Sequence, residues 1–185
     1  GVSAWTAYPK ALRLVIGLLG LCITWLAIAQ AKVIGTNFLL SVLALAWVAD
    51  IAAYFAGRTF GGHLIRRKLA ASISPGKSWE GALGGAASVV LLAFTWRQLD
   101  QTWALSSPSL YSRVSVQGTA VLIGVSLFMA SMSVVGDLIE SLVKRSAGVK
   151  DSSNLLPGHG GVLDRIDALL PTLPLAMLFY AWWKV

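Results

Sequence analysis

The acidic side chains of this sequence are spaced so that several of them could share one metal ion. Asp137 and Glu140 are three residues apart, which places both on one face of a helix. Asp164 and Asp167 repeat that spacing further along the chain. Mg²⁺ takes oxygen ligands, commonly one or two carboxylates together with the phosphates of a substrate. The residue types therefore predict a Mg²⁺ site, with Asp137 and either Asp164 or Asp167 as the best ligands.

The same carboxylates also have a structural interpretation. Acids in or beside an apolar segment can be held as ion pairs, and Lys144, Arg145 and Arg165 are the available partners. Glu140 could also face solvent at a helix end. Asp50 has two interpretations as well, because it could form a salt bridge with the basic loop that follows it or make a further contact with metal or nucleotide.

A second stretch that could bind an anion lies at residues 72–81. Ser74, the backbone of Gly76 and Lys77 precede a predicted helix, and the free N–H groups at a helix N-terminus favour negative charge. The alternative is an ordinary turn in which Ser78 caps the helix and Glu80 lies in its first turn.

The loop at residues 156–165 is rich in glycine. Gly158, Gly160 and Gly161 surround His159, and glycine allows the backbone to approach a ligand closely. A histidine between glycines is better placed to bind a phosphate or a base than to pack in a core. This pattern predicts a second phosphate or nucleotide contact.

The elements that must position these residues are apolar helices. Hydrophobic residues make up 56% of the 185 residues and charged residues only 12%, which is typical of a polytopic membrane protein. The net charge of +7 is carried at the ends of apolar runs, which argues against nucleic-acid binding. We expect an all-α fold, a single helical membrane domain over residues 1–185, with about five spans. These spans are 12–29, 38–56, 81–96, 119–143 and 166–183.

Loop charge predicts the orientation of these spans. The loops 57–79 and 144–165 are rich in Lys and Arg, which places them on the cytoplasmic side. The loop 97–118 then lies on the far side, and its polar part from 106 to 115 is interpreted as a plain connector. Three small residues on the third span, Gly81, Gly84 and Gly85, predict close packing against another helix.

The motifs resemble those of the phosphatidate cytidylyltransferase family, also called CDP-diacylglycerol synthases. The resemblance rests on S-x-V-K-R-x4-K-D-S-S-x-L-L-P-G-H-G-G-x-L-D-R-I-D at 141–167, with S-x-x-G-D-L-x-E at 133–140 before it. W-V-A-D-I-A-A-Y-F-A-G-R at 47–58 and S-P-G-K-S-W-E-G at 74–81 agree as well. The resemblance extends from about residue 12 to the end of the chain. Bacterial members of the family carry further N-terminal spans, so we expect this chain to be the C-terminal part of a larger enzyme.

The resemblance implies an activity in phospholipid biosynthesis, in which CTP and phosphatidic acid give CDP-diacylglycerol and pyrophosphate. It also implies dependence on Mg²⁺, with room for a second cation, a homodimer in the cell's inner membrane, and an active site that faces the cytoplasm. The implied metal ligands are Asp137, Asp164 and Asp167, and the implied catalytic cations are Lys144 and Arg165. The remaining implied contacts for CTP and phosphate are Ser74, Lys77, Arg145, Lys150, Asp151, His159, Gly160, Gly161 and Asp50.

Two other functions remain as alternatives. A CTP-dependent lipid kinase of the polyprenol type would share a polar nucleotide site but would phosphorylate an alcohol. An ion-coupled transporter could line its path with Asp50, Asp137 and Glu140, although it would then place charge near the middle of the membrane. The clustering of charge in loops and at one face favours the enzyme.

Overall fold

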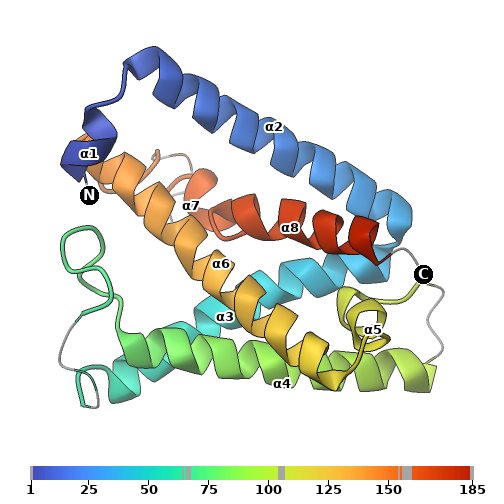
Figure 1. Cartoon of the computed structure of the whole chain (residues 1–185). Coiled ribbons are helices and arrows are strands. Elements are labelled where there is room, and N and C mark those ends of the chain that lie inside the picture. The colour runs from blue at the N-terminus through green and yellow to red at the C-terminus, as the bar shows by residue number, and fades with distance from the viewer. Residues whose placement is uncertain are drawn as a thin grey trace.

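The computed structural model describes residues 2–63, 65, 68–103, 107–153, 155 and 160–183. Within these ranges the chain forms α-helices and no strand (Figure 1). This confirms the all-α prediction. Three of the described helices are short: α1 is Val2–Thr6, α5 is Leu110–Ser115 and α7 is Leu163–Ile166.

Four helices of the described part are long and apolar enough to cross a bilayer. They are α2 (Lys10–Ile34), α3 (Thr36–Phe60), α4 (Trp79–Trp103) and α6 (Thr119–Ser146). At 1.5 Å per residue, a helix of 25 residues is about 37 Å long, which exceeds the ~30 Å hydrocarbon core of a membrane. Each helix is longer than its predicted span, because polar residues continue the helix beyond the apolar run.

The predicted fifth span has a different form. It is divided into α7 (Leu163–Ile166) and α8 (Leu169–Trp182), and α8 has 14 residues. A helix of that length reaches only about 21 Å, so α8 is too short to cross a bilayer alone. Helix α8 packs against both α2 and α6, and residues at its start, Leu170 and Pro171, lie against Thr24 and Gly136.

A proline inside α8 leaves one backbone carbonyl without its usual helical partner. Pro174 has no N–H group to donate to the carbonyl of Leu170, four residues earlier. The buried hydroxyl of Thr24 on α2 lies 3.1 Å from that carbonyl oxygen and 2.8 Å from the Gly20 carbonyl of its own helix, so its one hydrogen is shared between the two acceptors. Neighbouring helices satisfy such freed backbone groups in membrane proteins in this way.

The region after α4 is more ordered than a plain connector, so that interpretation was wrong for its described residues. Asp100 near the end of α4 accepts hydrogen bonds from Asn37 (2.8 Å), from Ser112, and from the backbone N–H and hydroxyl of Ser109. Ser109 caps α5 by accepting a bond from the backbone N–H of Ser112. A buried carboxylate thus joins the start of α3, the end of α4 and α5.

Helix α3 lies in the centre of the bundle and contacts α2, α4, α5, α6 and α8. Small residues let α4 approach it closely. A Cβ atom added at Gly81 or Gly85 would lie 2.8 Å from the carbonyl oxygen of Ala53 or Ala49, respectively. The prediction that these glycines serve helix packing is therefore confirmed.

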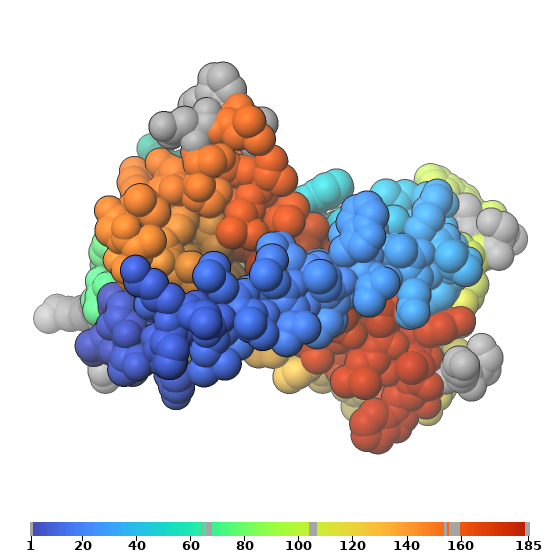
Figure 2. Space-filling model, turned by 90° about the horizontal axis from the view of Figure 1, so that it is seen from above, coloured from blue at the N-terminus to red at the C-terminus, as the bar shows by residue number. Residues whose placement is uncertain are grey.

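The two loops rich in functional residues meet at one end of the bundle. The end of α3, the start of α4 and the end of α6 all point to the left of Figure 1, α7 lies beside α6, and α5 lies at the opposite end. Residues from the end of α3, the start of α4, α6 and α7 line one cavity. Helix α2 crosses the outer face of the molecule (Figure 2, blue), where it exposes apolar side chains such as Leu14, Leu18 and Trp25.

Candidate functional site

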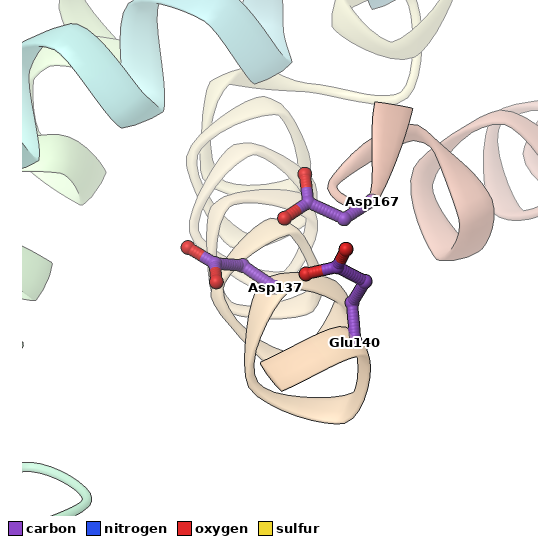
Figure 3. A group of neighbouring side chains, drawn as sticks. All are labelled: Asp137, Glu140 and Asp167. Atoms are coloured by element: carbon purple, nitrogen blue, oxygen red, sulfur yellow. The ribbon is translucent and has the colours of Figure 1, made fainter. Parts of the chain in front are cut away.

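Three carboxylates from two elements come together at this end of the bundle. Asp137 and Glu140 project from the last turns of α6, and Asp167 comes from the turn between α7 and α8 (Figure 3). One oxygen from each lies within 4.8 Å of the others. The spacing of three along α6 thus produces the shared face that the sequence predicts.

A glycine allows the two elements to approach each other. Gly136 precedes Asp137 and is buried against the start of α8. A Cβ atom at this position would lie 2.5 Å from the backbone oxygen of Asp167 and 2.9 Å from Cδ of Pro171. Only a residue without a side chain fits here, so Gly136 determines how close Asp137 comes to Asp167.

The acid group concentrates negative charge in a partly buried place. Asp167 is 8% exposed, and its burial raises its pKa to about 6, with the charges of Asp137 and Asp50 adding to the effect. The Glu140 side chain is 2% exposed. Carboxylate oxygens at this separation match the donor type that Mg²⁺ prefers, so the residues fit such an ion.

Lys77 approaches the acid group from the loop before α4 and forms an ion pair with Asp137. Backbone hydrogen bonds of a turn hold Lys77 in place. The N–H of Lys77 donates to the carbonyl oxygen of Ser74 (3.2 Å), and the N–H of Ser74 donates to the carbonyl oxygen of Ala70 (2.8 Å). Ser78 accepts from the N–H of Gly81 at 3.1 Å and so caps the start of α4. The sequence left open whether this stretch binds an anion or forms an ordinary capped turn. The two interpretations are compatible, because Ser78 caps the helix while Lys77 points into the site.

Glu80 has a role that the sequence interpretation missed. Its buried carboxylate accepts hydrogen bonds from the backbone N–H groups of Gly62 (3.0 Å) and Ile65 (2.9 Å). It thereby fastens the loop after α3 to the first turn of α4, next to Lys77. From the sequence, an acid in the first turn of a helix indicates only a favourable interaction with the helix dipole. Nothing in the sequence indicates that Glu80 bonds to backbone groups so far away along the chain.

Asp164 lies apart from the group of three and has its own set of partners. Its carboxylate accepts from Lys144 Nζ (2.6 Å), from the N–H of Gly161 (2.7 Å), and from the N–H (3.0 Å) and hydroxyl (2.9 Å) of Ser152. Although burial acts to raise it, these bonds and one with Glu140 hold the pKa of Asp164 well below its usual range. Lys144 Nζ also lies 2.5 Å from Glu140 Oε2. Asp164 and Glu140 therefore form ion pairs with Lys144, as the structural interpretation of these acids expects.

A cavity of about 430 Å³ lies between α3, α4, α6 and the turn before α8. Charged and polar side chains make up much of its wall: Asp50, Tyr54, Arg58, Lys77, Ser78, Asp137, Asp164 and Asp167. Two of these were not singled out from the sequence. Arg58 donates to the hydroxyl of Tyr54 at 3.1 Å, and both lie in the 47–58 stretch whose motif could have indicated them.

The other predicted contacts are placed less centrally. Arg145, Lys150, Asp151 and Arg165 are exposed and lie outside the cavity wall, as does the half-buried Ser74. Gly160 and Gly161 lie against Asp164 and Ser152, respectively. The predicted contact His159 lies outside the described residues.

Comparison with known proteins places this geometry in a family. Residues 2–183 match the model of the cytidylyltransferase family. The chain belongs to the cytidylyltransferase family. This agrees with the resemblance seen in the motifs.

Several relatives carry the name phosphatidate cytidylyltransferase. The protein from Haemophilus influenzae is 47% identical over 79% of this chain and 46% of its own length. Those from Pseudomonas aeruginosa and Bacillus subtilis are 43% and 35% identical, over 92% and 84% of this chain and 59% and 52% of their own lengths. The chain thus spans about half the length of the curated relatives it matches.

Proposed function

We propose that this chain carries the catalytic part of a membrane phosphatidate cytidylyltransferase, which converts CTP and phosphatidic acid to CDP-diacylglycerol and pyrophosphate. The names of the relatives and the family match support this reaction. The observation that carries it is the group of three carboxylates at the end of a helical membrane bundle, two of which, Asp137 and Asp167, line one cavity together with Lys77. A site at a span boundary is open to a nucleotide from water and to a lipid from the bilayer.

The cofactor of the proposed reaction is Mg²⁺, held by Asp137, Glu140 and Asp167. The hard oxygen donors of these side chains fit it. When bound, Mg²⁺ neutralises phosphate charge and acts as a Lewis acid. Asp50, on the cavity wall beside this group, adds a further oxygen donor for a second cation or for a bound water.

The reaction needs no special nucleophile. The phosphate monoester of phosphatidic acid is anionic near neutral pH. One of its oxygens attacks the α-phosphorus of CTP, a new phosphoanhydride bond forms, and the bond to the bridging oxygen breaks so that pyrophosphate leaves. The obstacle is repulsion between two polyanions. Lys77 and Arg58 provide positive charge on the cavity wall that reduces this repulsion and orients the phosphates.

The remaining features of the proposal concern the setting of the site. The chain is a multi-pass protein of the inner membrane, with the cavity facing the cytoplasm, and it works as a homodimer. The cationic loops at the cavity end support this orientation through the positive-inside rule. Arg145, Lys150, Asp151 and Arg165 are proposed to contact CTP or phosphate from the outer rim of the site, and His159 is proposed as a further contact.

The test is pyrophosphate release by the full-length protein in detergent, with CTP and Mg²⁺. We expect release that requires phosphatidic acid and that yields CDP-diacylglycerol. Diacylglycerol and a polyprenol are the matched control lipids, because a CTP-dependent kinase would convert them to lipid phosphate and release CDP instead. CDP formation, or no lipid-dependent turnover, would contradict the proposal.

A further inference from the structure

Asp164 stands out because its carboxylate is already fully used within the protein. A carboxylate has about four lone-pair sites, and that of Asp164 takes four donors in addition to its bond with Glu140. Oδ1 accepts from Lys144 at 2.6 Å, and Oδ2 accepts from Gly161 at 2.7 Å and from the N–H and hydroxyl of Ser152 at 3.0 and 2.9 Å. A metal ion could bind Asp164 only by displacing one of these bonds.

The partners of Asp164 belong to three separate parts of the chain. Lys144 is on the last turn of α6, Ser152 follows that helix, and Gly161 ends the glycine-rich loop. Asp164 therefore joins the segments 150–153 and 160–161 to each other and to α6. No other described acid makes so many bonds to residues of the 144–165 loop.

The glycines of the loop make room for these internal contacts. Gly160 has φ +77°, a conformation that favours glycine, and a Cβ atom there would lie 2.8 Å from Asp164 Oδ2. A Cβ atom at Gly161 would lie 2.9 Å from the backbone nitrogen of Ser153 and closer still to the Ser152 hydroxyl. The space that these two glycines leave is thus filled by the protein itself.

Lys144 connects this assembly to the acid group. Its ammonium lies between Asp164 and Glu140, at 2.6 and 2.5 Å, and its side chain is 17% exposed. Two carboxylates share one cation, so little of its charge is left for a substrate phosphate. Lys144 instead holds Glu140 in the place where it meets Asp137 and Asp167.

We propose that Asp164 is a positioning residue, which fastens the segments 150–153 and 160–161 to α6 and, through Lys144, fixes Glu140, while the cation is held by Asp137, Glu140 and Asp167. This inference deepens the proposed function and rests on it for the identity of the cation. It differs from the expectation raised by the motif, in which Asp164 is a metal ligand and Lys144 a catalytic cation.

The test uses the full-length protein in detergent and two readouts that need no turnover. Mn²⁺, as a stand-in for Mg²⁺, is titrated and followed by its electron paramagnetic resonance signal. Trypsin cleavage at the exposed Arg145, Lys150 and Arg165 is timed without metal. The variants are Asp164→Asn and, as the matched acid, Asp167→Asn.

We expect opposite patterns. Asp164→Asn should be cleaved about tenfold faster, as for loss of a charged hydrogen bond. Its Mn²⁺ affinity should change by less than about threefold, because Lys144 still pairs directly with Glu140. Asp167→Asn should lose about tenfold or more in Mn²⁺ affinity, with its cleavage rate unchanged. If Asp164→Asn instead loses Mn²⁺ as severely as Asp167→Asn and is cleaved at the parent rate, Asp164 is a metal ligand and the inference is wrong.

Gly161→Ala keeps the inference testable if Asp164→Asn does not fold. This variant leaves every acid in place but forces a methyl group against Ser152 and Ser153. Faster cleavage with unchanged Mn²⁺ affinity supports the inference, and an unchanged cleavage rate overturns it. Pyrophosphate release is measured separately, so an inactive parent enzyme with this binding pattern refutes the proposed reaction and not the role of Asp164.

Discussion

Gly136→Ala tests whether the close contact between α6 and the start of α8 controls the acid group. The added methyl group would lie 2.5 Å from the backbone oxygen of Asp167 and 2.9 and 3.0 Å from two carbons of Pro171. Ordinary contacts need about 3.4–4 Å, so the two elements must move apart by about 1 Å. Asp167 then moves away from Asp137.

The expected effect is larger on activity than on stability. Overpacking costs about 1–3 kcal/mol, and replacing glycine by alanine within a helix returns up to about 1 kcal/mol. The net loss of about 0–3 kcal/mol should lower Tm by a few degrees. A displacement of about 1 Å at the reacting groups can cost on the order of 100-fold in rate. We therefore expect lipid-dependent pyrophosphate release to fall about 100-fold while the protein stays folded.

Gly124→Ala is the matched control, because Gly124 lies on the same helix and a Cβ atom there would have nothing within 4 Å. Its activity should equal that of the parent, and its Tm should be unchanged or slightly higher. Both variants are purified in the same detergent, and Tm and turnover are measured on the same samples. If Gly136→Ala behaves like Gly124→Ala in both measurements, the contact does not position Asp167 and the reasoning fails.

Three further predictions concern packing and charge. Thr24→Val should lower the free energy of unfolding by about 1 kcal/mol, because the Leu170 carbonyl loses its donor. In the same denaturation assay, Thr95→Val should change the free energy of unfolding little, because the Thr95 hydroxyl bonds only within its own helix. Gly85→Ala should lower the free energy of unfolding by about 1–3 kcal/mol, because the added methyl group pushes α4 away from the Ala49 carbonyl. The control is Gly17→Ala, whose methyl group meets nothing within 4 Å and should cause no such loss. Equal Tm values for the two variants would contradict the close packing of α4 on α3. Asp167 has a raised pKa of about 6, so its charged form disfavours the metal-free fold above that pH, and below it a proton competes with the cation. Mn²⁺ affinity should thus weaken by up to about tenfold per pH unit below 6, and a flat titration from pH 7.5 to 5 would show that Asp167 is not a ligand.

The sequence predicted the elements and the location of the site well, for definite physical reasons. Apolar runs of about 20 residues specify helices because a bilayer leaves the backbone no other partner, and α2, α3, α4 and α6 follow from this. The spacing of Asp137 and Glu140 specifies a shared helix face. Charged loops flanking these runs identify the end of the bundle where the cavity lies.

The grouping of the acids could not be predicted, because it depends on contacts between distant residues. Asp164 and Asp167 have the same spacing as Asp137 and Glu140, and a continuous helix would place both toward α6. The chain instead turns between α7 and α8, so Asp167 faces the acid group and Asp164 faces Lys144 and the glycine-rich loop. The spacing of residues along the chain predicts neither this turn nor which carboxylates pair with Lys144.

Asp100 shows why a buried acid is not by itself evidence of a site. It is as buried as Asp167 and lies in an apolar helix, so composition alone would rank the two equally. Asp100, however, is surrounded by donors from Asn37, Ser109 and Ser112 that compensate its charge. Around Asp167 the neighbours include two further carboxylates, and within the described part of the chain its hydrogen-bond donor is the backbone N–H of Ala168. The arrangement at Asp100 stabilises the fold without help, whereas the group at Asp137, Glu140 and Asp167 accumulates charge that a cation would relieve. The difference in donors, rather than burial, identifies the end of the bundle at which the chemistry takes place.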